Sequence, residues 1–167
     1  MNGLLFDIEA NGLLQKTSEI PEATTAWCTV THDLYTGVVQ SYPPDSIGES
    51  IDSLRAAECL VGHNIIGYDL KLLWRLYGEW DTHPLILDTL VVSRALNPER
   101  KGGHSLAAWG ERLGFPKGDF HEFDKYSPEM LTYCERDVEL NVAVLRELGK
   151  EMESQYGTTL QGYKVYT

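Results

Sequence analysis

The stretch from Leu4 to Leu14, LLFDIEANGLL, constrains the fold of this chain most. It begins as an apolar run, which is typical of a buried strand, but Asp7 and Glu9 interrupt the run two residues apart. Side chains that are two residues apart on a strand point to the same face. Two adjacent buried carboxylates repel each other and cost free energy unless a cation, an opposite charge or a proton compensates them. The alternative is a strand that ends at Asp7, followed by a solvated turn over residues 9–12.

The rest of the chain has the pattern of a mixed sheet covered by helices, which is an α/β fold. The first three strands come in succession, with His32–Leu34 as a short hairpin link, and strands then alternate with helices. We expect strands over 3–9, 24–31, 35–43, 59–64 and 84–87, and helices over 47–57, 67–78, 88–96, 104–114 and 127–152. Ser46 or Asp45, Asp88 and Ser127 are the residues expected to begin helices.

Helical spacing places two more acids on inward faces. In the last helix, Asp137 is the charged member of a stripe whose other members are Met130, Tyr133, Leu140, Val144 and Leu148. Asp137 is too far from the helix start to act as a cap, so we expect its carboxylate to face the core. Tyr133 lies one turn earlier on the same side, where its hydroxyl could reach whatever Asp137 binds. Asp69 begins the apolar face of residues 67–78, and a capping or helix-dipole role is the alternative for this residue.

Four acids on separate elements are thus expected to point inward, and no Lys or Arg shares their faces. They are Asp7, Glu9, Asp69 and Asp137. Buried carboxylates without an opposite charge call for a cation, and ligands that are all oxygen favour Mg²⁺ or Mn²⁺ over zinc.

The same residues resemble the Exo I, Exo II and Exo III motifs of DnaQ-like 3′→5′ exonucleases. The motifs are Asp7-Ile8-Glu9, the segment from Asn64 to Asp69, and the segment from Tyr133 to Asp137. Tyr133 at the start of the third motif is similar to the DEDDy subgroup. The segments DIEANGLL, DTLVVSRAL, HSLAAWGERLG and YCERDVELN look especially like the proofreading domain of family A DNA polymerases from short-tailed phages. The resemblance covers most of the chain.

This resemblance implies an RNase H-like fold with a central first strand and a last helix that packs across the sheet. It implies two divalent ions, Mg²⁺ or Mn²⁺, about 3.5–4 Å apart on either side of a scissile phosphate. Asp7 would bridge both ions, Glu9 and Asp137 would complete the site that activates water, and Asp69 would support the second site. Tyr133 would orient the attacking water, because a phenol with a pKa near 10 is a poor base at neutral pH.

The resemblance also suggests residues that contact the substrate. The backbone of Ala10 would meet the terminal 3′-OH, and Leu13 would wedge against the terminal bases, although ordinary packing is the alternative for Leu13. Asn64 would bind the sugar or backbone near the terminus, or else shape the turn before its helix. The main basic cluster, Arg94, Arg100 and Lys101, would meet upstream phosphates unless it is a solvated loop. His63 and His104 are expected to be structural or exposed, and Trp27, Trp74 and Trp109 to be core residues.

Composition limits the partners of the protein. A chain of 167 residues fits one exonuclease domain over 1–167, and its 14 Lys and Arg against 25 Asp and Glu give a charge of −11. That balance argues against a protein that wraps long nucleic acid and leaves a small contact on a single-stranded DNA 3′ end. A DNA polymerase, in cis or in trans, is the partner that the resemblance implies. No apolar run is long enough for a membrane span, and Cys28, Cys59 and Cys134 fit reduced thiols of a cytoplasmic protein, in an infected host if the phage resemblance holds.

Two other functions remain open from the sequence. A 3′→5′ exoribonuclease on short RNA, similar to oligoribonuclease, would use the same four acids, because discrimination depends on contacts with the 2′-OH. A catalytically silent adaptor could also have this fold, although it would not need all four acids and Tyr133.

Overall fold

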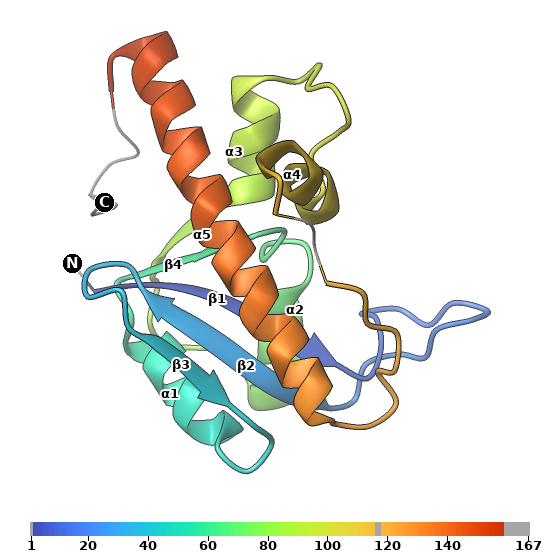
Figure 1. Ribbon diagram of the computed structural model, residues 1–167. Coiled ribbons are helices and arrows are strands. Elements are labelled where there is room, and N and C mark those ends of the chain that lie inside the picture. Colours follow the sequence, from blue (N-terminus) through green and yellow to red (C-terminus); the bar gives the residue numbers. More distant parts are fainter. Residues whose placement is uncertain (1, 116–117, 159–167) are drawn as a thin grey trace.

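The computed structural model describes residues 2–115 and 118–158 (Figure 1). Its strands are β1 (Gly3–Ala10), β2 (Ala26–Asp33), β3 (Val39–Tyr42), β4 (Cys59–Gly62) and β5 (Leu85–Asp88). Its helices are α1 (Ile47–Ala56), α2 (Asp69–Tyr77), α3 (Thr89–Leu96), α4 (Leu106–Leu113) and α5 (Pro128–Tyr156). The element order therefore follows the order expected from the sequence.

The strands form one mixed sheet in the order β3-β2-β1-β4-β5, with β1 in the centre. β2 is antiparallel to β1 and β3, whereas β4 is parallel to β1 and β5. The expected fold class, a mixed five-stranded sheet with flanking helices, is confirmed. A central strand has neighbours on both sides, so its backbone is held firmly in place.

Helices cover both faces of the sheet. α5 crosses one face, with α3 and α4 beside it, and α1 and α2 lie on the other side (Figure 1). Along β1 the side chains alternate: Leu5 packs in the core under α5, whereas Phe6 and Ile8 pack with α1 and α2. Asp7 and Glu9 share the face of Leu5. The strand thus continues past Asp7, and both carboxylates are on the α5 side of the sheet.

Side chains cap two of the helices as the sequence predicts. Asp88 accepts a hydrogen bond from the Leu90 N–H at the start of α3, and Ser127 accepts one from the Met130 N–H at the start of α5. Pro128 is the first residue of α5, where its missing N–H costs nothing. Ser46 precedes α1 but makes no such bond from its side chain.

The hairpin between β2 and β3 differs from the prediction. β2 continues to Asp33, and the turn occupies residues 34–38 instead of 32–34. The Asp33 carboxylate accepts hydrogen bonds from the N–H groups of Tyr35 and Thr36, each at 2.8 Å, and Gly37 takes a left-handed φ of 75°. An Asp that binds the backbone two and three residues ahead places the turn after itself.

The tryptophans also differ in part from the prediction. Trp109 is buried as expected, but Trp74 is 41% exposed because it lies on the solvent side of α2 with Lys71 and Arg75. Trp27 is partly buried, and its indole N–H donates to the Phe123 carbonyl at 2.9 Å.

Two smaller expectations concern the cysteines and the membrane. Cys28, Cys59 and Cys134 are all buried free thiols. Across the described residues, none of the helices is both long and apolar enough to cross a bilayer.

Candidate active site

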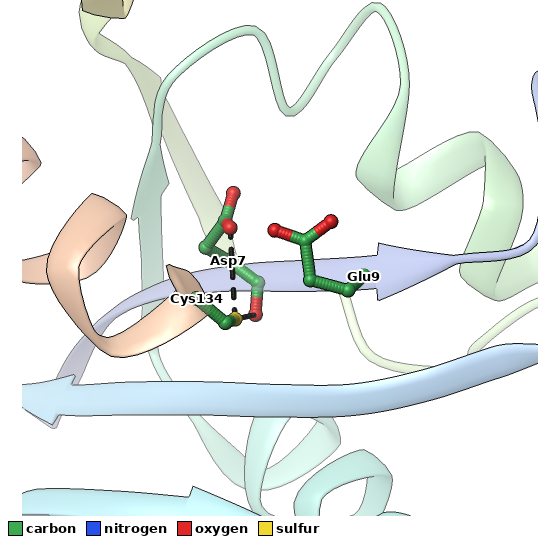
Figure 2. Close-up of side chains that lie close together, drawn as sticks. All are labelled: Asp7, Glu9 and Cys134. Carbon is green, nitrogen blue, oxygen red and sulfur yellow. Dashed lines mark hydrogen bonds between the residues drawn. The ribbon is translucent and has the colours of Figure 1, made fainter. Parts of the chain in front are cut away.

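Asp7 and Glu9 present their carboxylates side by side near the end of β1 (Figure 2). Glu9 is only 9% exposed, and Asp7 is partly buried. Ligand atoms of Asp7, Glu9 and Cys134 all lie within 4.8 Å of one another. The Cys134 thiol, from α5, donates to the Asp7 backbone carbonyl at 3.5 Å and to its carboxylate at 3.6 Å. The contact with Cys134 on α5 therefore holds Asp7 in position.

The other two acids approach this pair from separate helices. Asp69 is the first residue of α2 and is 4% exposed, and Asp137 is 3% exposed on α5, three residues after Cys134. Asp137 lines the same cleft as Asp7. Three elements that are far apart in the sequence thus bring buried carboxyl groups to one region.

The electrostatics of the region are those of crowded negative charge. Burial raises the pKa of the Asp69 carboxyl well above its usual value, and the charges of Asp7 and Asp88 raise it further. Burial also raises the pKa of Tyr68, with added contributions from Asp69, Glu9 and Asp7. A divalent cation would relieve this repulsion, and the carboxylate oxygens of the site suit Mg²⁺ or Mn²⁺.

A cleft of about 490 Å³ opens on the Glu9 side of the acids, and we call it the Leu13 cleft. Glu9, Ala10 and Leu13 line one part of it, and His121 and Phe123 line another. Within the described residues its lining includes no Lys or Arg. This cleft therefore suits an uncharged group such as a base or a sugar better than a phosphate.

The loop over residues 11–23 that forms this cleft is well anchored. The Tyr68 hydroxyl donates to the Gly12 carbonyl at 2.5 Å, and the Arg75 guanidinium binds the Leu14 carbonyl at 2.6 Å and the Glu22 carboxylate at 2.9 Å. Leu13 and Glu22 form an isolated bridge. Leu13 is 37% exposed, as a residue that contacts a ligand would be.

A second cleft of about 380 Å³ opens on the Asp7 side, and we call it the Arg94 cleft. Its lining combines Asp7 and Asp137 with His63, Asn64, Leu90, Arg94, His104, Ser105 and Leu106. Arg94 is exposed, so its charge is accessible from solvent. This cleft has an acidic wall and a wall with a cation, which suits a metal-bound phosphate.

Known proteins similar in sequence to this chain include two phage DNA polymerases. The chain is 29% identical to the DNA-directed DNA polymerase of Enterobacteria phage T3 and 28% identical to that of Escherichia phage T7, in each case over 87% of this chain. It spans about a quarter of the length of these curated relatives, 26% of each. No protein-family model matches the sequence.

Similar solved structures include nucleases and polymerases. The family B DNA polymerase of the archaeon Pyrobaculum calidifontis superposes with a TM-score of 0.61 at 17% identity, over 89% of this chain and 24% of that one. NrnC of Brucella melitensis with bound Mg²⁺ gives 0.62 at 15% identity, over 91% and 74%. Exonuclease X, in complex with 5′ overhanging duplex DNA, gives 0.50 at 17% identity, over 98% of both chains. The chain thus shares the fold of these proteins, which is the fold that the resemblance to DnaQ-like exonucleases predicts.

Tyr133 lies on α5 one turn before Asp137. Its ring is partly buried and packs against Phe120 and Phe123 of the preceding loop, with ring centroids 5.7 and 6.2 Å away. Phe123 also lines the Leu13 cleft. Tyr133, the first residue of the third motif, is thus linked to the Leu13 cleft through Phe123.

The three residues of the expected basic cluster lie in different surroundings. Arg94 lines the cleft beside the acids. Arg100 is 9% exposed, binds both carboxylate oxygens of Glu151 on α5, and stacks on Trp109 at 4.5 Å. The guanidinium of Arg100 is thus engaged inside the fold and does not face a cleft where it could contact a phosphate. Lys101 is exposed and is not part of the lining of either cleft.

The structure also adds two residues to the candidate site. His63 and His104 were expected to be structural or exposed, yet both line the Arg94 cleft. Each ring is oriented by a buried hydroxyl of α3: His63 Nδ1 lies 2.9 Å from Thr89 Oγ1, and His104 Nδ1 lies 2.9 Å from Ser93 Oγ. Their convergence depends on how α3 and the following loop pack, which no spacing in the sequence reveals.

Proposed function

We propose that this protein is a metal-dependent 3′→5′ exonuclease that removes nucleoside 5′-monophosphates from single-stranded or frayed DNA ends. The observation that supports this most is the pair of adjacent carboxylates, of which Glu9 lines the Leu13 cleft and Asp7 lines the Arg94 cleft together with Asp137. The buried Asp69 is near enough for the charge of Asp7 to raise its pKa. A substrate that spans the two clefts would pass directly over the carboxylates. The polymerases among the similar proteins agree with this proposal.

Asp7, Glu9, Asp69 and Asp137 would hold two divalent ions, Mg²⁺ or Mn²⁺. Bound there, such ions activate a water and stabilise the leaving oxygen in an in-line displacement. Asp7, on the central strand, would be shared between the two ions, with Glu9 and Asp137 on one side and Asp69 on the other. Tyr133 would orient the attacking water through its hydroxyl, in keeping with the DEDDy subgroup.

The two clefts suggest how a strand would lie. The terminal nucleoside would occupy the Leu13 cleft, where Leu13 packs on the bases and the backbone of Ala10 meets the 3′-OH. Upstream phosphates would meet Arg94, and Asn64 would bind the sugar or backbone between them. With this polarity the scissile phosphate would lie at the acids, and nucleotides would be removed in the 3′→5′ direction.

The test is digestion of single-stranded DNA labelled at either end, with Mn²⁺ or Mg²⁺. We expect release of mononucleotides from the 3′ end, no activity with a chelator, and no activity in Asp137→Asn. A matched control is Asp52→Asn, which changes an acid whose side chain is 81% exposed on α1. Cleavage from the 5′ end would contradict the polarity, and absence of metal-stimulated cleavage would favour the silent adaptor.

The second candidate is a 3′→5′ exonuclease that acts on short RNA. It is favoured by the NrnC structure bound to pGG, which superposes with a TM-score of 0.61 at 16% identity over 91% of this chain. Matched DNA and RNA oligonucleotides of two to ten nucleotides distinguish the two candidates. A higher kcat/KM on dinucleotide RNA than on longer DNA would replace the first proposal.

We further propose that residues 1–167 act as one exonuclease domain together with a DNA polymerase, in cis or in trans. The lengths of the phage relatives support this, because most of each polymerase lies outside the matched region. Proofreading during DNA replication is the activity that such an arrangement would serve.

A further inference from the structure

Asp88 is a buried acid that does not face either cleft. It is 4% exposed, is the last residue of β5, and caps α3 by accepting the Leu90 N–H at 3.0 Å. A Ser, Thr or Asn would cap a helix equally well, and none of them would place a charge in the interior. The cap alone therefore does not explain an ionisable residue here.

The same carboxylate binds a second segment of the chain. Oδ1 accepts the Asn64 N–H at 2.8 Å, and Oδ2 accepts the Ile66 N–H at 3.0 Å. These bonds therefore need two acceptor oxygens on one side chain, and Ser, Thr and Asn each have only one. Asp88 joins the end of β5 to the turn that precedes α2.

This turn has an uncommon backbone. Asn64 has a φ of 64°, and it is not a glycine, so its conformation must be held by its surroundings. The N–H groups of Gly67 and Tyr68 both donate to the Asn64 carbonyl at 3.0 Å. With its N–H on Asp88 and its carbonyl in the turn, Asn64 is fixed at both ends.

The conformation of this turn determines where α2 begins. The side chain of Tyr68, which precedes the helix, makes no capping hydrogen bond to α2, and the Leu70 N–H donates back to the Ile65 carbonyl at 3.0 Å. Ile65 is fully buried. Asp69, the first residue of the helix, is therefore placed by the turn.

We propose that Asp88 is a positioning residue: by holding the Asn64–Ile66 turn, it places the Asp69 carboxylate so that it can serve the metal site. The inference rests on the proposed function, because Asp69 has a role only if the acids bind cations. Partners that orient metal ligands typically contribute 10- to 100-fold in metal affinity. Asp88 is such a partner, acting through the backbone.

Two variants separate the bonds of Asp88 to the turn from its bond as the cap of α3. Asp88→Ser keeps an oxygen for the Leu90 N–H but is too short to reach the turn. Asp88→Asn keeps the shape but sets an amide NH₂ against a backbone N–H. The control is Ser127→Ala, which removes the cap of α5, a bond of the same kind that holds Met130 at 3.2 Å.

Amide hydrogen exchange tests the turn without any metal. In Asp88→Ser we expect the Asn64 and Ile66 N–H groups to exchange about tenfold faster or more, because each loses a bond to a charged acceptor. The Leu90 N–H should keep its protection. Unchanged exchange at Asn64 and Ile66 would overturn the inference at its first step.

Binding of Mn²⁺, followed by electron paramagnetic resonance or calorimetry, tests the consequence. We expect Asp88→Ser to lower the Mn²⁺ affinity of one of two sites by about tenfold or more. Asp88→Asn should lower this affinity less, and Ser127→Ala should leave it unchanged. In the Asp69→Ala background, Asp88→Ser should have no further effect, because it acts through Asp69.

The outcomes distinguish the two proposals. If the wild type binds two Mn²⁺ ions and Asp88→Ser binds them equally well, Asp88 is only a helix cap and this inference fails alone. The inference would also be overturned if Asp88→Ser lowered the Mn²⁺ affinity equally in the wild-type and Asp69→Ala backgrounds. If the wild type binds no Mn²⁺, the proposed function fails, and this inference fails with it. If Asp88→Ser does not fold, Asp88→Asn answers the same questions.

Discussion

At the scale of single residues, the charge of Asp7 acts directly on its neighbours. Asp7 contributes to the raised pKa of Asp69, and it adjoins Glu9 within the same cluster. Evolution of a stable core alone would remove such an acid. Its cost in free energy is consistent with a role that needs charge at this point.

The first prediction concerns Asp7→Ala. Cleavage should be abolished, while the free energy of unfolding without metal should stay the same or rise, because repulsion among the acids falls. Thermal unfolding with and without Mn²⁺ measures both effects, and the stabilisation by Mn²⁺ should disappear. Asp52→Ala is the control for loss of an exposed acid. A variant that retains substantial activity in saturating Mg²⁺ would rule out a bridging role for Asp7.

The second prediction concerns pH and Asp69. Its pKa is raised in the folded protein, whereas an Asp in the unfolded chain ionises near pH 4. Between these pH values the folded state binds more protons, so stability without metal should fall as pH rises from about 4 toward the folded pKa, by up to 1.36 kcal/mol per unit. Asp69→Asn should lack this contribution. Denaturant unfolding of the wild type and Asp69→Asn in the presence of a chelator, from acid to neutral pH, measures this contribution. If the free energy of unfolding changed with pH in parallel in the two proteins, the pKa of Asp69 would not be raised in the folded state.

The third prediction concerns Tyr133→Phe. The ring should still pack on Phe120 and Phe123, so stability and Mn²⁺ affinity should be kept, whereas the rate should fall about 10- to 1000-fold because one positioned hydroxyl is lost. Tyr42→Phe is a matched control, because Tyr42 is buried and its hydroxyl donates to Gln40 Oε1 at 3.0 Å. Equal single-turnover rates for Tyr133→Phe and the wild type would reduce Tyr133 to a packing residue.

At the scale of elements, sequence periodicity predicted what depends on a single strand or helix. The inward position of Asp137 follows from the stripe on α5, and the shared face of Asp7 and Glu9 follows from the alternation of β1. Asp88 was predicted as a cap because that bond is local. Its bonds to Asn64 and Ile66 were not, because they join segments more than twenty residues apart.

The same reason explains why the three residues of the expected basic cluster lie in different surroundings. Arg100 and Glu151 are far apart in the sequence, and only the packing of α5 beside the loop after α3 brings them together. A charge that looks free in the sequence can thus be an internal link. Arg94 and Arg100, six residues apart, have opposite surroundings.

The fourth prediction uses this contrast. Arg100→Ala should lower the free energy of unfolding by roughly 2–4 kcal/mol, because it leaves a partly buried Glu151 without its partner and removes the stacking on Trp109. Arg94→Ala should change stability by no more than about 0.5 kcal/mol but raise KM for DNA. Denaturant unfolding and steady-state kinetics on the two variants measure both. The reverse pattern would show that the two arginines have been assigned the wrong roles.

At the scale of the whole molecule, charge decides how DNA can be held. A net charge of −11 disfavours binding along a long polyanion such as DNA. Among the described residues that line the two clefts, Arg94 is the only Lys or Arg. Affinity must therefore come from the few nucleotides nearest the acids, through bound cations and stacking on residues such as Leu13 and Phe123.

The fifth prediction follows from that balance. For single-stranded DNA, a plot of log K against log salt should have a shallow slope, on the order of −1 to −3, because each neutralised phosphate of a single strand contributes about −0.7. Stacking of the last two to four bases, worth roughly 1–3 kcal/mol each, should supply much of the rest. The protein alone should then bind weakly, act distributively and prefer frayed ends. Titration of the wild type with oligonucleotides of increasing length, in Ca²⁺ at several salt concentrations and with a check that the oligonucleotides stay intact, measures both quantities. Arg94→Ala under the same conditions should make the slope shallower by about 0.7. Affinity that keeps rising well beyond a handful of nucleotides, with a steep slope, would reveal an extended binding track and contradict the end-binding arrangement of the two clefts.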